Sequence, residues 1–180
     1  RNLAGGVAGP LVLATSHHIG LHRLPPVLRG EVELAVITLP PSVEPPLQAL
    51  PLWLDPLVAV AARTHPLAQG PEPAAAALGE HPAILPGEAT FTRLIIEEGL
   101  ARLGVAPPVA FATNYLETIK MMVVVGLGWS VLPRTMLDGE LVELAIAGLR
   151  LQRLLGVVCH TGRTLSNAAR AMVATLGNTY

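Results

Sequence analysis

The sequence has 180 residues, of which 51% are hydrophobic and 14% charged, with a net charge of −1. So many apolar residues can fill a hydrophobic core, which excludes a disordered chain. The near-neutral balance argues against a domain that grips nucleic acid by itself, because that normally requires a basic surface.

The cellular compartment of the protein can be inferred from its one cysteine and from the lengths of its apolar runs. Cys159 has no second cysteine to pair with, so a reducing compartment is the simpler interpretation. The longest apolar run, residues 121–132, is too short for a membrane span and is broken by two glycines. No charged-then-apolar signal segment opens the sequence. We therefore expect a cytoplasmic protein with no membrane contact.

Apolar runs and breakers in the first third predict three strands and one helix. Strands are expected at residues 11–15 (LVLAT), 34–38 (LAVIT) and 57–62 (LVAVAA), and a helix at 19–28. Residues 40–46 carry four prolines and predict an extended connector.

The rest of the chain continues the alternation of strands and helices. Strands are expected at 82–85, 109–113, 129–132, 141–146 and 154–159, and helices at 91–103, 116–125 and 165–176. This order predicts an α/β fold with largely parallel sheets.

Three predicted strand-to-helix junctions carry small polar side chains. They are Thr15-Ser16-His17, the stretch from Gly87 to Thr90, and Thr113-Asn114. Free backbone N–H groups and the helix dipole at such positions favour an anion or a carbonyl oxygen. In open α/β sheets, ligands bind beyond the carboxyl ends of the strands, where all three junctions lie. Plain N-capping is the alternative, because Ser, Thr and Asn are its ordinary residues.

Other chemistry has little support in the sequence. His17, His18 and His22 invite a metal site, but no carboxylate or thiolate nearby supplies a third ligand, so no metal or other cofactor is expected. Motifs of nucleophilic, phosphate-binding and metalloprotease sites are missing, so we do not expect an enzyme. Cys159 in an apolar strand is expected to be inert core.

Four stretches of the sequence resemble the sensing domain of LysR-type transcriptional regulators. They are LAGGVAGPLVLATSHHIGLHRLPPVL at residues 3–28, RGEVELAVIT at 29–38, LWLDPLVAVAARTHPLA at 52–68 and NYLETIKMMVVVGLGWSVLP at 114–133. Glu33 stands where the family usually has Asp. Singly each motif is degenerate, but together they span nearly the whole chain.

The resemblance implies a two-lobed fold like that of type 2 periplasmic binding proteins. Two Rossmann-like lobes would be joined by two crossovers, near residues 54–58 and 132–135. Lobe I would comprise residues 1–57 and 135–180, and lobe II residues 58–134. The three polar junctions would then face one cleft between the lobes.

The resemblance also implies the residues that line this cleft. The stretch Thr15, Ser16, His17 and His18 is similar to the turn with which the cysteine-regulon activators of this family hold small anions. The second-lobe positions are Thr90, Phe91, Thr113 and Asn114, and Thr38 at the end of LAVIT is a further cleft position.

The implied partners are a small, anionic effector and a second copy of the chain. The family forms an antiparallel dimer in which the helix at 19–28 meets the helix at 116–125 of the other copy, with a tetramer possible in the full-length protein. The family's winged helix-turn-helix is not in this sequence, so DNA and RNA polymerase would be contacted only through a longer protein. A periplasmic solute-binding protein of a transporter is the runner-up, and a small α/β enzyme is a third class.

One departure from the family lies at residues 28–31 (LRGE). This stretch directly joins two segments that the family separates by a strand and a helix of roughly 25 residues. Either this segment is deleted from the protein, or the protein contains it and residues 28–31 are numbered consecutively across it. We favour the second, because losing a central strand would expose sheet edges.

Overall fold

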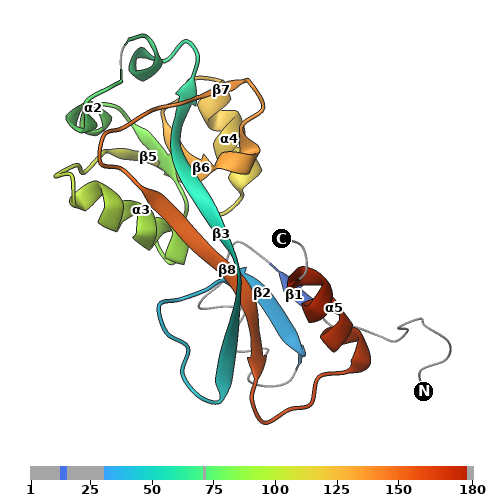
Figure 1. Cartoon of the computed structure of the whole chain (residues 1–180). Coiled ribbons are helices and arrows are strands. Elements are labelled where there is room, and N and C mark those ends of the chain that lie inside the picture. Colours follow the sequence, from blue (N-terminus) through green and yellow to red (C-terminus); the bar gives the residue numbers. More distant parts are fainter. Residues whose placement is uncertain (1–12, 16–30, 71, 178–180) are drawn as a thin grey trace. The chain divides into compact units, whose positions relative to one another are not determined.

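The computed structural model describes residues 13–15, 31–70 and 72–177, which fall into two compact units (Figure 1). The first unit is made of Arg1–Leu54 and Leu154–Tyr180, and the second is Asp55–Arg153. Each unit has hydrophobic clusters of its own. The expected helix at 19–28 and the junction at 28–31 lie outside the described residues.

The sheet of the first unit is built on the LAVIT strand, β2 (Leu34–Thr38). It pairs in parallel with β1 (Leu13–Thr15) and antiparallel with β8 (Leu151–His160). Alternate residues of β2 enter two different clusters, Leu34 with Val157 and Ala35 with Val158. A strand buried on both faces is uniformly apolar, which accounts for the LAVIT run.

The last helix, α5 (Asn167–Gly177), is attached to this sheet by a carboxylate. Glu33, just before β2, accepts hydrogen bonds from the Ser166 backbone N–H at 2.8 Å and from its hydroxyl at 3.0 Å. The Ser166 hydroxyl oxygen in turn accepts the Ala169 N–H and so caps the helix. Glu33, the acidic position of the family motif, therefore fixes the start of α5.

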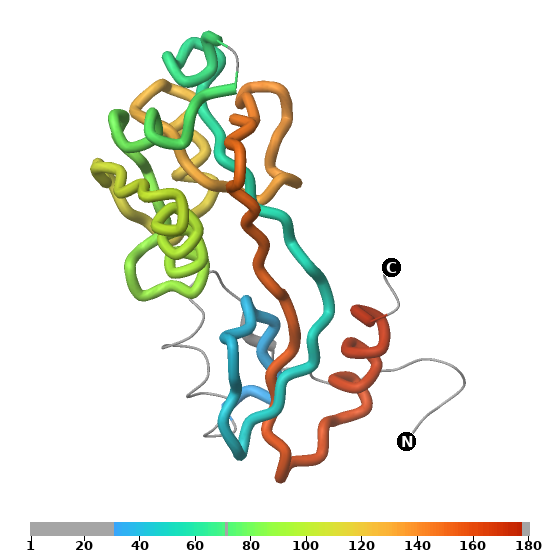
Figure 2. The backbone as a smooth tube through the Cα atoms, turned by 60° about the vertical axis from the view of Figure 1, so that its left-hand side comes forward, coloured from blue at the N-terminus to red at the C-terminus, as the bar shows by residue number. Residues whose placement is uncertain are grey.

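Two long strands continue from one unit into the other (Figure 2). They are β3 (Leu47–Ala62) and β8, which are hydrogen-bonded neighbours. The chain thus leaves the first unit within β3, near the expected crossover at 54–58. Residues 47–56 were not expected to be a strand, and the prolines at 51 and 56 are atypical of one.

The second crossover lies about twenty residues later than expected, between Arg153 and Leu154 instead of near 132–135. The chain stays in the second unit after Pro133 because β7 (Leu141–Glu143) pairs with β3, and Leu144 and Ile146 enter the same core as Leu57. Residues 135–153 therefore belong to the second unit, and the lobe boundary expected from the sequence is corrected accordingly.

In the second unit, β3 lies between β6 (Ser130–Pro133) and β7, and Val60 is paired with a residue of each. Strand β4 (Ala83–Leu85) pairs in parallel with β5 (Val109–Ala112), and an isolated bridge joins Ala83 to Trp129. The pairings of β6 and β7 with β3 and of β8 with β2 are antiparallel, so the expectation of largely parallel sheets is wrong. The six-stranded sheet is mixed, and the β4–β5 sheet is parallel.

Helices cover both faces of this part of β3. Leu57, Ala59 and Ala61 share a cluster with residues of α3 (Phe91–Ala101), whereas Val58 and Val60 share one with residues of α4 (Leu116–Val124). A short helix, α2 (Ala75–Glu80), was not expected from the sequence. Among the described residues, no helix combines the length and apolarity needed to cross a bilayer.

Trp129 is fully buried in the second unit. Its indole N–H donates to the carbonyl oxygens of Leu78 and His81, each at 3.1 Å. The neighbouring Gly128 is needed for this packing, because a Cβ there would lie 2.3 Å from the Pro82 carbonyl oxygen.

Two histidines meet beside this core. His65 is 7% exposed, its Nδ1 accepts the Leu67 N–H at 3.2 Å, and its ring lies edge-on to His81 with centroids 5.1 Å apart. Burial and the neighbouring His81 both lower the pKa of His65. The folded state therefore favours the neutral imidazole, whereas the unfolded chain takes up a proton near its ordinary pKa of about 6.5.

We expect this difference to make the second unit acid-sensitive. The stabilisation by neutral His65 is complete above pH of about 6.5 and is lost as the pH falls below it towards the lowered pKa of the folded state. His65→Asn keeps an acceptor near the Nδ1 position and should flatten the decline in the free energy of unfolding, measured with urea between about pH 7.5 and 5.5.

The matched control is His160→Asn, because His160 Nδ1 also accepts the N–H two residues ahead, that of Gly162 at 3.0 Å, but from a half-buried position in the first unit. Equal pH profiles for the two variants would contradict the assignment to His65.

Candidate functional site

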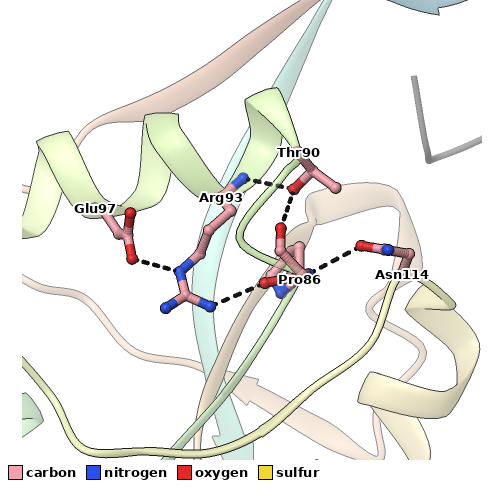
Figure 3. Close-up of polar contacts among 6 residues, drawn as sticks. Pro86, Thr90, Arg93, Glu97 and Asn114 are labelled. Carbon is pink, nitrogen blue, oxygen red and sulfur yellow. Dashed lines mark hydrogen bonds and ion pairs between the residues drawn. The ribbon is translucent and has the colours of Figure 1, made fainter. Parts of the chain in front are cut away.

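The turn between β4 and α3 is held by its own cap residue, Thr90 (Figure 3). The Thr90 hydroxyl donates to the Gly87 carbonyl oxygen at 2.9 Å and accepts the Arg93 backbone N–H at 3.1 Å. Thr90 is 6% exposed. Its one hydroxyl proton is therefore committed to the turn, and the capping interpretation holds for this residue.

The junction between β5 and α4 contacts the turn between β4 and α3. Strand β5 ends at Ala112, and the Asn114 side-chain oxygen accepts the Gly87 N–H at 2.9 Å. Any Cβ at position 87 would lie 2.8 Å from that oxygen, so glycine is required for this contact. The structure thus brings Thr90 and Asn114 to the same edge of the β4–β5 pair.

Thr113 and Phe91 lie at the same edge. The Thr113 N–H donates to the Leu85 carbonyl oxygen at 3.1 Å and extends the parallel ladder. Its hydroxyl accepts the Tyr115 N–H at 3.4 Å, a long contact, while α4 itself begins with no side-chain cap. Phe91 is half-buried at the first position of α3.

Arg93 completes the site and was not anticipated from the sequence. Its side chain is 5% exposed, Nη1 donates to the Pro86 carbonyl oxygen at 2.9 Å, and Nε pairs with Glu97 at 2.7 Å (Figure 3). The guanidinium therefore holds the turn through Pro86. The spacing of Arg93 and Glu97, four apart on a helix, was the available signal, but it is common on helix surfaces.

The groups at the start of α3 that are able to donate a hydrogen bond to a ligand are chiefly backbone N–H groups. The first-turn N–H groups of a helix have no partner within the helix, and α3 offers those of Phe91 and Thr92 beside the committed hydroxyl. With the positive end of the helix dipole, such amides suit an anionic oxygen. The Thr90 hydroxyl thus holds the turn from which these amides project.

Two predicted site residues of the first unit are described, and both lie at carboxyl ends of parallel strands. Thr15 ends β1 opposite Val36 of β2, and Thr38 ends β2. Thr38 is 1% exposed, and its hydroxyl oxygen is buried without a hydrogen-bond partner. A buried unpaired hydroxyl is costly, so this one requires an explanation. Ser16, His17 and His18 lie outside the described residues.

A separate hollow of about 700 Å³ lies in the second unit, between β3 and residues 143–152. It contains none of the predicted site residues. Its Arg134 and Glu143 pair with each other at 2.6 Å, and none of its described lining residues holds a buried polar atom without a partner, the feature that would indicate a ligand. In the part of the chain that the structure describes, no three His, Cys, Asp or Glu side chains gather as metal ligands would.

Comparison with known families identifies the class of domain. The family described as the LysR substrate binding domain matches residues 27–180. The chain belongs to this family and has its α/β fold of the type 2 periplasmic-binding-protein kind.

Individual relatives agree with the family. The HTH-type transcriptional regulator CbbR of Rhodospirillum rubrum is 38% identical over 90 residues, which are 47% of this chain and 30% of that regulator. The CcmR regulatory domain of Synechocystis PCC6803, solved in complex with 2-PG, is 28% identical with a TM-score of 0.74, over 86% of this chain and 76% of that one. The C-terminal domain of a probable LysR family regulator from Rhodococcus sp. RHA1 is 26% identical with a TM-score of 0.78, over 94% and 99%.

Removal of the Thr90 hydroxyl should weaken the start of α3 without any ligand present. We expect Thr90→Val to lower the free energy of unfolding by about 1–2 kcal/mol, measured with urea, and Thr90→Ser to restore most of it. Thr118→Val makes the same chemical change at an exposed position of α4 and should cost less than about 0.5 kcal/mol. Equal losses for Thr90→Val and Thr118→Val would show that the cap contributes nothing.

Proposed function

We propose that this chain is the effector-sensing domain of a cytoplasmic bacterial transcriptional regulator and binds a small anion. The observation that carries the proposal is the joining of two strand-to-helix turns in the second unit through Gly87 and Asn114. This contact aims the start of α3 at the edge where ligands bind in α/β sheets.

The first unit carries proposed ligand-contacting residues of its own. Thr15 and Thr38 end neighbouring parallel strands, and the unpartnered Thr38 hydroxyl is the kind of group that a bound ligand would satisfy. We propose that Thr15, Ser16, His17, His18 and Thr38 contact the ligand from this side. The CcmR regulatory domain is a relative that was solved with a small molecule, 2-PG, bound.

The ligand would act by changing the balance between two arrangements of the units. A ligand favours the arrangement in which it makes more contacts, by no more than its difference in affinity for the two arrangements. One or two charge-assisted hydrogen bonds would make that difference on the order of 2–4 kcal/mol. DNA-binding heads in a longer protein would then be re-spaced, and RNA polymerase contacted through them.

A transporter's solute-binding protein shares this kind of fold and is the second candidate. Membership of the LysR substrate binding domain family and the match to a transcriptional regulator favour sensing over transport.

Binding can be tested by calorimetry with 2-PG as the probe. We expect Thr15→Ala and Thr38→Val each to weaken binding by about 1–3 kcal/mol, because each removes a hydrogen bond to a charged oxygen. Thr90→Ala should also weaken binding, because the turn that positions the α3 amides loses the bonds of the Thr90 hydroxyl. Thr90→Ser keeps a hydroxyl and should retain the affinity. Thr118→Ala is the control and should bind as the unmodified chain does. Unchanged affinity in all three site variants would refute the proposed site.

We also propose that the domain pairs with a second copy of itself through the outer side of β5 and α4. Large apolar side chains lie exposed there, between 41% and 68%: Val109, Phe111, Tyr115, Met121, Val125 and Leu127. So many exposed large apolar side chains on two elements that are consecutive in the chain are typical of an interface. The segment at 19–28, which the family resemblance implies as the facing helix, lies outside the described residues.

Sedimentation equilibrium at micromolar concentration tests the pairing. The unmodified chain should sediment as a dimer, and Met121→Glu with Val125→Glu should yield monomers, because two charges would be buried without partners. Leu94→Glu is the matched control, since Leu94 is an apolar residue 44% exposed on α3. A monomeric unmodified chain, or dimers that survive the double substitution, would rule out this interface.

A further inference from the structure

An ion pair between a buried arginine and a half-buried aspartate joins the first and last residues of the second unit. Arg153 Nε lies 2.7 Å from the Asp55 carboxylate, and the two side chains are 7% and 12% exposed. Asp55 lies on β3 and Arg153 on β8, the two strands through which the chain crosses between the units. The pair therefore fastens the two crossing strands together within the second unit.

The same guanidinium extends to the helix that carries the candidate site. Arg153 Nη1 donates to the Thr92 hydroxyl at 3.4 Å, a long contact between two buried side chains. Thr92 lies in the first turn of α3, two residues after the cap Thr90, and its own N–H is one of the first-turn amides. One side chain thus contacts both crossing strands and the start of the candidate site.

A second contact joins α3 to β8 further along the helix. Gly99 lies so close to β8 that a Cβ in its place would be 2.2 Å from the Leu151 side chain. The Gly99 and Thr92 contacts are about two helical turns apart and reach alternate residues of β8, Leu151 and Arg153. The helix therefore contacts β8 at two points, one in its first turn and one near its end.

Stability alone is a weak reason for such a pair. Burial of two charges costs desolvation energy, and well-packed apolar residues in their place are often as stable. A buried arginine can instead fix the relative positions of two strands and a helix start. Its planar guanidinium donates hydrogen bonds to acceptors on several elements at once.

We propose that Arg153 is a positioning residue that couples the ligand-binding start of α3 to the two strands crossing between the units. This role rests on the proposed function of the α3 start. A displacement at the Phe91 and Thr92 amides reaches β8 through Thr92 and Arg153, and reaches β3 through Asp55. Arg153 needs no contact with the ligand.

The coupling can be tested first without any ligand, by amide hydrogen exchange on the 180-residue chain. Thr92→Val removes the acceptor for Arg153 Nη1 at nearly constant volume. We expect it to speed exchange at residues 151–153 roughly threefold or more, because the strand loses its tie to the helix. Thr92→Ser should restore the slow exchange, and Thr118→Val should leave it unchanged. Unaltered exchange at 151–153 in Thr92→Val would overturn the proposal.

The second measurement adds 2-PG as the probe. In the unmodified chain, 2-PG should slow exchange both at residues 91–93 and at residues 151–153. In Thr92→Val the slowing at 91–93 should remain, while that at 151–153 should fall to less than about half. Slowing that persists at both places in Thr92→Val overturns the coupling but leaves the ligand site intact. If 2-PG slows exchange nowhere, the binding proposal fails for this probe, and the ligand-free experiment still decides the coupling.

Discussion

The burial of β3 on both faces is the constraint on which the second unit depends. Odd-numbered residues from Leu57 to Ala61 pack with the α3 cluster, and the even-numbered Val58 and Val60 pack with the α4 cluster. Each helix covers one face of β3. The parallel strands β4 and β5 end at the same edge, so the turns that follow them lie together there. The position of the candidate site thus follows from the strand that both helices share.

Much of this arrangement could be predicted from local sequence signals. The apolar runs at β2 and β6, the helix at α3 and the cap at Thr90 depend on periodicity and on residue chemistry within a few positions. The family motifs added the two-lobed plan. Capping and ligand binding could not be separated at this level, since both require the same residues at a helix start. The bonds of the Thr90 hydroxyl show that this side chain caps α3, and its role in ligand binding stays a proposal.

The parts that could not be predicted are those fixed by long-range contacts. The turn at Gly87 is held by Asn114, 27 residues later in the sequence, and by the buried Arg93. The second crossover was misplaced because nothing local in residues 135–153 shows that β7 pairs with β3. The first half of β3 was also not predicted. It contains Pro51 and Pro56, and proline is tolerated in a strand only where its missing N–H is not needed for pairing.

The order of the chain has a consequence for biosynthesis. The second unit is one continuous stretch, so all its partners have been synthesised once Arg153 leaves the ribosome. The first unit is assembled from both ends: β2 must wait for β8, and Glu33 for Ser166, 133 residues later. Since compact units generally fold as they emerge, the second unit is able to fold before the first is complete. The apolar LAVIT segment then stays without its β8 and α5 partners until the C-terminal part of the first unit has been synthesised.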